Sequence, residues 1–259
     1  MPDWLVVLIL GCIEGITEFL PISSTGHLLL AEHWLGSRSD VFNVVIQTGA
    51  VMAVVMVFAQ RVKELLTGFS RPEVRDYLFK LGGAFILTAI GGLLLKKFHL
   101  KLQHDPRPVA LATLIGGAAF IGLERWLKGR PTSENVTWTI AIVIGLAQLI
   151  AATFPGASRS GTTILLALAV GLSRSAATEF SFLLGIPTLL AAGVKESYDA
   201  FKHGTPHEPW LMIALGTVVS AITAFLTVKW LLGYVRHHTF TPFGWYRVAV
   251  GALILFLVQ

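Results

Sequence analysis

The sequence is poor in charge and has almost no cysteine. Only 14% of its 259 residues are charged, whereas soluble domains have about 25%. Hydrophobic residues make up 54% of the chain, and the mean hydropathy is +0.70. This composition excludes a soluble globular domain and places the chain in a bilayer. The single cysteine, Cys12, excludes a disulfide framework, a zinc site built on cysteine spacing and the Cys-x5-Arg loop of cysteine phosphatases.

Basic residues do not indicate a nucleic-acid partner here. The net charge is +5 and the pI is near 9.5, but most of the 20 Lys and Arg residues lie between apolar segments and are typical of topology signals. The first apolar segment, 4–20, lacks the basic region of a signal peptide and carries Glu14 and Glu18. It is therefore predicted to be a retained membrane element.

Ten apolar segments follow one another along the chain, and most are close to the roughly 20 residues that cross a bilayer as a helix. They lie at about 4–20, 22–35, 41–59, 79–95, 109–123, 137–154, 158–172, 176–194, 211–234 and 244–258. The segments after Pro21 and Pro155 are only about 11 to 14 residues long, and each opens with a serine-rich turn. They are predicted to be halves of re-entrant hairpins, because polar turns at membrane depth must be buried in protein or line a cavity.

An internal repeat relates the two halves. Placing Gly11–Ser24 over Gly145–Ser158 pairs Glu14 with Gln148, Pro21 with Pro155 and Ser24 with Ser158, and Ser37-Arg38-Ser39 matches Ser173-Arg174-Ser175. We expect an all-α polytopic membrane protein, a single domain made of repeats 1–130 and 131–259. Each repeat would contain one re-entrant helical hairpin and three transmembrane helices, giving six full spans. Because three crossings are odd in number, the two repeats have inverted topology.

Positive charge predicts the orientation. On this topology twelve Lys and Arg residues, Arg247 among them, fall on one side and seven on the other, while Arg159 lies inside the membrane. The larger number favours the cytoplasmic side, so both termini are expected outside the cytoplasm.

Glu14 and Glu18 are the first candidate site residues. Their spacing of four places both carboxylates on one helix face, about 5–6 Å apart. Two such groups in an apolar segment need a cation, a shared proton or a basic partner. The favoured interpretation is a divalent cation, Mg²⁺ or Ca²⁺, held by oxygen ligands. The alternative is a polar lining of a helix interface or a segment at the membrane edge.

The first turn joins hydroxyls to a histidine. Between Pro21 and Gly26 lie Ser23, Ser24 and Thr25, and His27 follows. A hydroxyl with a histidine base is one candidate nucleophile, and the histidine itself is another. The alternative is a Ser or Thr N-cap followed by a histidine that bonds the backbone.

The second turn places Arg159 at membrane depth, where an unpaired arginine is costly. The flanking serines and Gly161 let backbone N–H groups converge beside a helix N-terminus, which favours an anion. Arg159 would bind phosphate in bidentate fashion, with hydroxyl donors from Ser158, Ser160 and Thr163. The alternative is a structural Arg159–Glu18 ion pair between the repeats, and both can hold in the empty state.

The two motifs together resemble one bacterial family over essentially the whole chain. They are Glu14-x3-Glu18-Phe-Leu-Pro-x-Ser-Ser-Thr-Gly-His27 and Pro155-Gly-x-Ser-Arg-Ser-Gly-x-Thr163, joined by Phe180–Leu184 and Pro242-Phe243-x-x-Tyr246-Arg247. The family is that of the undecaprenyl-diphosphate phosphatases, also known for bacitracin resistance. The resemblance implies release of the terminal phosphate from undecaprenyl diphosphate, which recycles the carrier lipid for peptidoglycan synthesis. It also implies a bacterial inner-membrane enzyme whose site opens to the periplasm.

The resemblance also implies roles for single residues. Glu14 and Glu18 would be the acidic pair tied to Mg²⁺ or Ca²⁺, and Ser24 with His27 the region of the nucleophile. Ser158, Arg159 and Thr163 would hold the diphosphate. From the residues alone, a phosphoenzyme on Ser24 or His27 and direct attack by water remain open, as does the oligomeric state.

Other functions fit less well. A second lipid phosphatase family uses a Lys-x6-Arg-Pro motif, but here seven residues separate Lys63 from Arg71-Pro72, and no histidine follows Ser158-Arg159 at that family's distance. A transporter or flippase for a polyprenyl phosphate lipid is the main alternative, since inverted repeats are common in transporters. Such a binder has no evident use for Ser24 and His27 beside two carboxylates. A purely structural scaffold leaves Arg159 unexplained.

Overall fold

The computed structural model describes residues 1–97, 106–203 and 208–257, in which the regular structure is helical apart from one isolated bridge between Ser133 and Leu172. The helices are α1 (Asp3–Thr17), α2 (Ser24–Leu35), α3 (Asp40–Val57), α4 (Ala59–Thr67), α5 (Pro72–Lys97), α6 (Pro106–Leu127), α7 (Trp138–Thr153), α8 (Arg159–Ala169), α9 (Arg174–His203), α10 (Trp210–Tyr234) and α11 (Thr241–Leu257). The ten predicted apolar segments each correspond to one helix.

The eleventh helix, α4, was not predicted from the apolar segments. It follows α3 after a break at Phe58 and is amphipathic, with Leu65 buried and most of its other side chains at least partly exposed. A short helix of this kind lacks the long apolar run by which the membrane helices are found.

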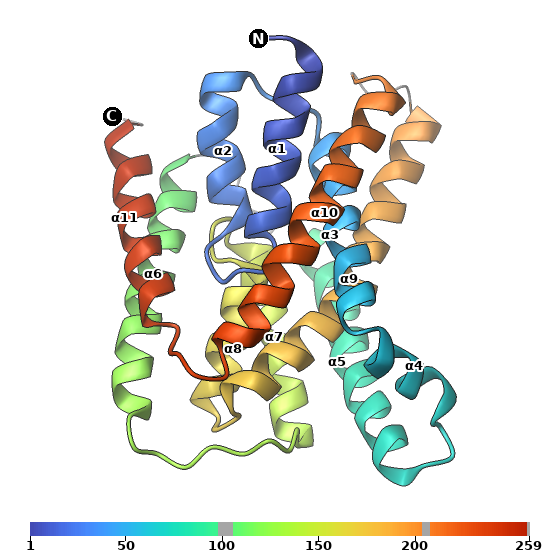
Figure 1. Cartoon of the computed structure of the whole chain (residues 1–259), viewed down its shortest axis with the longest axis vertical. Coiled ribbons are helices and arrows are strands. Elements are labelled where there is room, and N and C mark those ends of the chain that lie inside the picture. Colours follow the sequence, from blue (N-terminus) through green and yellow to red (C-terminus); the bar gives the residue numbers. More distant parts are fainter. Residues whose placement is uncertain (98–105, 204–207, 258–259) are drawn as a thin grey trace.

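The chain is a multi-pass membrane protein by the length and composition of its helices. Five of them, α3, α5, α6, α9 and α10, are long and apolar enough to cross a bilayer, while α7 and α11 are apolar but shorter within the described residues. Both termini lie at the same end of the molecule, at the top of Figure 1.

Small residues bring the helix backbones together. A Cβ on Gly11 of α1 would lie 2.7 Å from the Gly216 carbonyl oxygen of α10, and one on Gly117 of α6 would lie 2.6 Å from the Gly244 carbonyl oxygen of α11. Likewise, Gly145 of α7 packs against Ala84 of α5. These close approaches are the usual way in which membrane helices associate, since lipid provides little hydrophobic drive between them.

Candidate active site

Two helical hairpins, α1–α2 and α7–α8, enter the molecule from opposite ends, and their turns lie side by side in its middle (Figure 1). The contact between them is polar. The Ser160 hydroxyl at the start of α8 lies 3.2 Å from the Glu18 carbonyl oxygen and 3.0 Å from that of Leu20. The two serine-rich motifs, far apart in sequence, therefore form one site.

Each turn ends in a serine with left-handed backbone geometry. Ser23 has φ 75° and Ser158 has φ 68°, and they are the two non-glycine residues with positive φ in the described ranges. Each side chain caps the helix that follows, accepting from Gly26 N at 3.2 Å and from Gly161 N at 3.1 Å. Such backbone strain is typical of functional sites.

This geometry corrects the repeat alignment. The structural equivalent of Ser158 is Ser23, not Ser24, because the two serines share backbone conformation and cap. The second turn has one residue more between its proline and its serine, and it accommodates that residue with Gly156 at φ 92°. The helices that follow are both capped by serines, Ser39 for α3 and Ser173 for α9. The match of Ser37-Arg38-Ser39 to Ser173-Arg174-Ser175 is therefore two residues out of register.

The capping serines leave backbone donors free at both turns. The first N–H groups of α2, on Ser24 and Thr25, and of α8, on Arg159 and Ser160, have no acceptor among the described residues. Free N–H groups at a helix N-terminus favour an anion. Two such N-termini, called nests below, lie at the meeting point of the hairpins.

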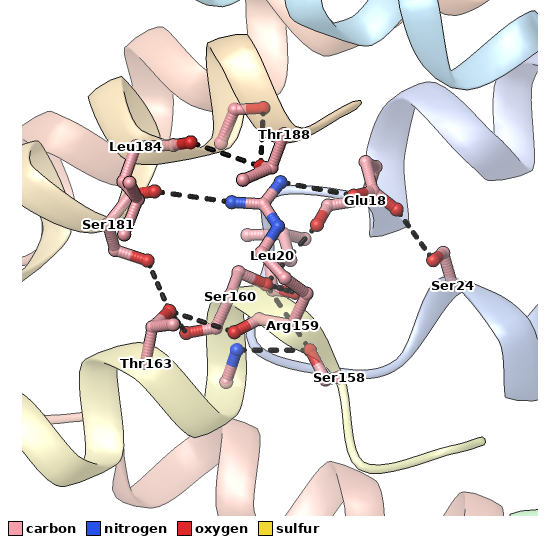
Figure 2. Close-up of polar contacts among 12 residues, drawn as sticks. Glu18, Leu20, Ser24, Ser158, Arg159, Ser160, Thr163, Ser181, Leu184 and Thr188 are labelled. Atoms are coloured by element: carbon pink, nitrogen blue, oxygen red, sulfur yellow. Dashed lines mark hydrogen bonds and ion pairs between the residues drawn. The ribbon is translucent and has the colours of Figure 1, made fainter. Parts of the chain in front are cut away.

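Glu18 and Arg159 connect the two turns (Figure 2). Arg159 Nη2 donates to Glu18 Oε1 at 3.1 Å, and Ser24 Oγ donates to Glu18 Oε2 at 2.8 Å. The Arg159–Glu18 ion pair, the alternative to anion binding in the sequence analysis, is therefore present between the two turns, and both partners are mostly buried.

The Arg159 guanidinium retains a free donor. Its Nη1 lies 3.3 Å from the Ser181 carbonyl oxygen, and its carbon lies 4.9 Å from the centre of the Phe19 ring. Its Nε is buried without an acceptor among the described residues. On α8, Thr163 exchanges a hydrogen bond with the Ser181 hydroxyl (Figure 2). An oxyanion at the turns would therefore find an unpartnered N–H on Arg159 beside the free backbone donors.

Glu14 is fully buried, and neither of its carboxylate oxygens has a hydrogen-bond partner among the described residues. By contrast, Gln148, with which Glu14 pairs in the sequence alignment of the two halves, donates to Thr88 Oγ1 at 3.0 Å. Two orphaned oxygens four residues from Glu18 fit a divalent cation. The described residues contain no cluster of three or more metal-ligating side chains. An ion at Glu14 and Glu18 would therefore take its other ligands from water or phosphate, as Mg²⁺ commonly does.

His27 bonds Ser23 and Tyr246 rather than the Ser24 hydroxyl. Its Nδ1 lies 2.7 Å from the Ser23 carbonyl oxygen, which can only accept, so Nδ1 carries the proton. Its Nε2 then accepts from the Tyr246 hydroxyl at 2.8 Å, and the two rings are stacked. Because Ser24 donates to Glu18, the hydroxyl and the base that the structure brings together are Ser24 and Glu18.

Three residues that contact the turns were not predicted as site residues: Ser181 on α9, and Tyr246 and Arg247 on α11. All three lie in the secondary motifs Phe180–Leu184 and Pro242–Arg247, which were noted only as a resemblance. Arg247 was counted as a cytoplasmic charge, and that count is wrong: its side chain is fully buried and bonds both turns. A charged residue within an apolar run was the signal available.

Thr25 lines a cavity of about 590 Å³ at the terminus-bearing end, together with residues of α2 and α3. A larger cavity, about 750 Å³, lies near the opposite end, by α4 and the beginnings of α5 and α7. Its charges are largely paired, with Arg61 bonded to Glu64 at 2.7 Å and to Glu179 at 2.9 Å. We therefore place the site at the turns, where donors are unpaired, rather than in the larger cavity.

Comparison with known proteins gives a consistent result. The family model for bacitracin resistance protein BacA matches residues 7–253. A protein of Xylella fastidiosa (strain 9a5c) named undecaprenyl-diphosphatase is 51% identical over 257 residues, which cover 98% of each chain. Proteins of the same name from Rhizobium etli (strain CIAT 652) and Xanthomonas axonopodis pv. citri (strain 306) are 49% and 48% identical. The matches cover 98% of this chain and 96% and 97% of those relatives.

Proposed function

The chain belongs to the bacitracin resistance protein BacA family, and on that premise we propose that its two turns together form the site that cleaves undecaprenyl diphosphate. The protein is an integral-membrane hydrolase that converts undecaprenyl diphosphate to undecaprenyl phosphate and inorganic phosphate. This reaction recycles the lipid carrier for peptidoglycan synthesis and accounts for bacitracin resistance.

The observation that carries the assignment to the turns is the pair of opposed anion nests. A diphosphate bears several negative charges within a few ångströms, and a membrane site must replace its hydration with fixed donors. The free N–H groups of α2 and α8 and the Nε of Arg159 supply such donors. The hydroxyls of Ser23, Thr25 and Ser158 complete the proposed binding set, while the apolar helices accommodate the prenyl chain. The predicted donors Ser160, Gly161 and Thr163 already bond protein groups, so they support the turn rather than bind phosphate directly.

Ser24 is the proposed nucleophile and Glu18 its base. Ser24 Oγ attacks the terminal phosphorus, its proton passes to Glu18 Oε2, and the bond between that phosphorus and the bridging oxygen breaks. Undecaprenyl phosphate leaves with the electron pair, and water then cleaves the phosphoserine to restore the Ser24 hydroxyl.

His27 completes the proposed catalytic set. It follows Ser24 by one helical turn, and its tautomer is fixed by the Ser23 carbonyl oxygen. This leaves Nε2 as the basic nitrogen, bonded to Tyr246 and partly accessible. We assign to it the activation of the water that attacks the phosphoserine.

A divalent cation, Mg²⁺ or Ca²⁺, fits Glu14 and Glu18. The orphaned oxygens of Glu14 are the supporting observation. Such an ion would neutralise charge that develops on the phosphoryl oxygens. Because Glu18 Oε1 and Oε2 already bond Arg159 and Ser24, Glu14 would be the main protein ligand.

An inverted repeat is supported by how the helices pack. In the proposed architecture α1–α6 and α7–α11 each provide one re-entrant hairpin and three spans, within residues 1–130 and 131–259. The contact of α1 with α10 then has a counterpart in that of α7 with α5. The contacts α3–α9 and α6–α11 join equivalent helices. The six spans would be α3, α5, α6, α9, α10 and α11, with α4 outside the repeat.

A bacterial inner-membrane location with a periplasmic opening fits the distribution of basic residues, cavities and exposed tryptophans. Without Arg247 the basic residues divide eleven to seven, which still favours termini outside the cytoplasm. The cavity beside Thr25 lies at the terminus-bearing end. Exposed tryptophans mark both ends of the helices, as interfacial anchors do. They are Trp4, Trp34 and Trp210 at one end and Trp126 and Trp138 at the other.

The decisive experiment is phosphate release from undecaprenyl diphosphate by purified protein in detergent, with and without a chelator. Arg159→Ala and Glu18→Gln should each lower kcat/KM by a factor on the order of 10²–10³ or more, because each removes charge stabilisation or the base. Chelation should stop the wild-type reaction. Well-folded wild-type protein that binds the lipid without releasing phosphate would contradict the proposal and favour a transporter.

A further inference from the structure

Arg247 of α11 is fully buried, and all its recorded hydrogen bonds go to backbone carbonyl oxygens. Nη1 donates to Pro21 O of the first turn at 3.2 Å. Nη2 donates to Gly156 O at 3.2 Å and Ala157 O at 2.9 Å in the second. Further donation to Ala112 and Thr113 of α6 holds the guanidinium in place. One side chain thus connects both turns to two helices.

The surrounding helices leave room for this guanidinium and little more. A Cβ added to Gly116 of α6 would lie 2.2 Å from Arg247 Nη2. One added to Gly161 of α8 would lie 2.6 Å from Nη1. Because both nearest atoms belong to the planar guanidinium head, a methyl group at either position would push it off the carbonyl oxygens.

Stability alone does not explain this arrangement. In the described part of the chain no carboxylate lies within ion-pair distance of Arg247, so a buried cation is balanced by neutral dipoles only. Such burial is costly in a membrane. By contrast, Arg159 and Arg174 each have a carboxylate partner, Glu18 and Glu124 respectively.

The bonds to Arg247 also set the direction of a donor in the site. In a planar trans peptide the C=O and the following N–H point in opposite directions. Holding the Ala157 carbonyl on Arg247 therefore turns the Ser158 N–H away from Arg247. That N–H has no acceptor among the described residues, and it precedes the free N–H groups of Arg159 and Ser160.

We infer that Arg247 is a positioning residue for the diphosphate site: it holds the two nests in register, and its uncompensated charge adds to the attraction for the anion. The inference rests on the proposed function of the turns. It assigns the residue no contact with substrate. Its effect passes through the backbone of residues 21 and 156–158.

Four variants and one matched control test this role. Arg247→Gln removes the charge and most donors, and Arg247→Lys keeps the charge but has no planar fork to reach both turns. Gly116→Ala displaces the guanidinium without changing any charge. Arg174→Gln breaks an ion pair with the buried Glu124, away from the turns. Gly122→Ala is the control, since Gly122 lies on the same helix as Gly116 and has no atom within 4 Å of the new Cβ.

Two readouts are needed: kcat and KM for undecaprenyl diphosphate in detergent, and the rise in thermal unfolding temperature caused by inorganic diphosphate. We expect Arg247→Gln to lower kcat by about 10²-fold, raise KM and abolish the thermal shift. Arg247→Lys should keep KM near wild type while kcat falls at least tenfold. Gly116→Ala should resemble Arg247→Lys, and Gly122→Ala should match wild type. Arg174→Gln should lower thermal stability with kcat and KM of the folded protein unchanged.

A merely structural Arg247 would behave like Arg174. If folded Arg247→Lys and Gly116→Ala proteins keep wild-type kcat, KM and thermal shift, the inference is wrong. Failure of the proposed function looks different. In that case wild-type protein releases no phosphate, yet the inorganic diphosphate shift still reports whether Arg247 organises an anion site. Loss of that shift in Arg247→Gln and Gly116→Ala, but not in Gly122→Ala, supports the inference even then.

Discussion

The two turns share a backbone but differ in side chains. Each has a left-handed serine that caps the following helix, Ser23 in one and Ser158 in the other. In the structural alignment Ser24 of the first turn is replaced by Arg159 in the second, and His27 by Thr162. The first turn thus carries the groups proposed to react, and the second carries the groups proposed to bind. On the proposed repeat, one backbone arrangement carries two sets of side chains, and the proposed roles of the turns differ for that reason.

The largest expected effect comes from replacing each of three serines by alanine, which distinguishes the two proposed roles. Ser24→Ala should lower kcat by roughly a thousandfold or more, because it removes the proposed nucleophile. Ser23→Ala and Ser158→Ala should each cost about 1 kcal/mol of stability through the lost cap and roughly tenfold in kcat/KM through a loosened nest. Steady-state kinetics of the three proteins measures the difference.

A Ser23→Ala protein as inactive as Ser24→Ala would break this comparison, since turn geometry would then outweigh the hydroxyl of Ser24. Trapping of labelled phosphate on the protein provides an independent check. Ser24→Ala should trap none, and Ser158→Ala should trap as much as wild type.

The next effect concerns the equivalent pair Glu14 and Gln148. Glu14→Gln should lower the affinity for Mg²⁺ or Ca²⁺ by about 10–100-fold. It should leave thermal stability unchanged or raised without metal, because it removes a buried carboxylate that has no partner. The reverse change, Gln148→Glu, should destabilise by about 1–3 kcal/mol, since it loses the bond to Thr88.

Metal titration of activity and thermal unfolding in chelator measure the two quantities. Equal metal dependence in wild type and Glu14→Gln would place the cation elsewhere.

The smallest effect lies outside the site, on α4. The hydrogen bond from Arg61 lowers the pKa of Glu64, and the charges of Arg61 and Arg71 lower it further. Because the pKa of Glu64 is lower in the folded state, its carboxylate stabilises the folded protein at pH values above the ordinary pKa of 4.5. This stabilisation is lost as the pH falls through the folded-state pKa. Near neutral pH the thermal unfolding temperature of wild type should therefore be slightly higher than that of Glu64→Gln, and this difference should vanish in acid.

Thermal unfolding across this pH range, with activity recorded at neutral pH, tests the prediction. Glu73→Gln serves as control because Glu73 is exposed and has no ion pair among the described residues. Activity should not change in either variant. A loss of activity in Glu64→Gln would mean that the paired charges of the larger cavity take part in turnover.

Reasoning from the sequence located the membrane helices and both turns, because each depends on local signals. Long apolar runs determine the helices, and Pro, Gly and Ser at fixed spacing determine the turns. It missed α4, whose amphipathic pattern is short, and it mispaired Ser24 with Ser158, because one extra residue in the second turn shifts the register after the proline. It also placed Arg247 outside the membrane, since a charge near a helix end resembles a topology signal.

What the sequence alone determined is therefore the class of protein and the chemistry of its motifs, which follow from composition and from residue types close together in the chain. Only the tertiary structure decided which groups meet. Glu18 bonds Ser24, His27 bonds Tyr246, and Arg247 holds both turns. These partners are separated by up to 226 residues. Their contacts depend on the glycine-mediated packing of helices from both halves, which no local pattern specifies.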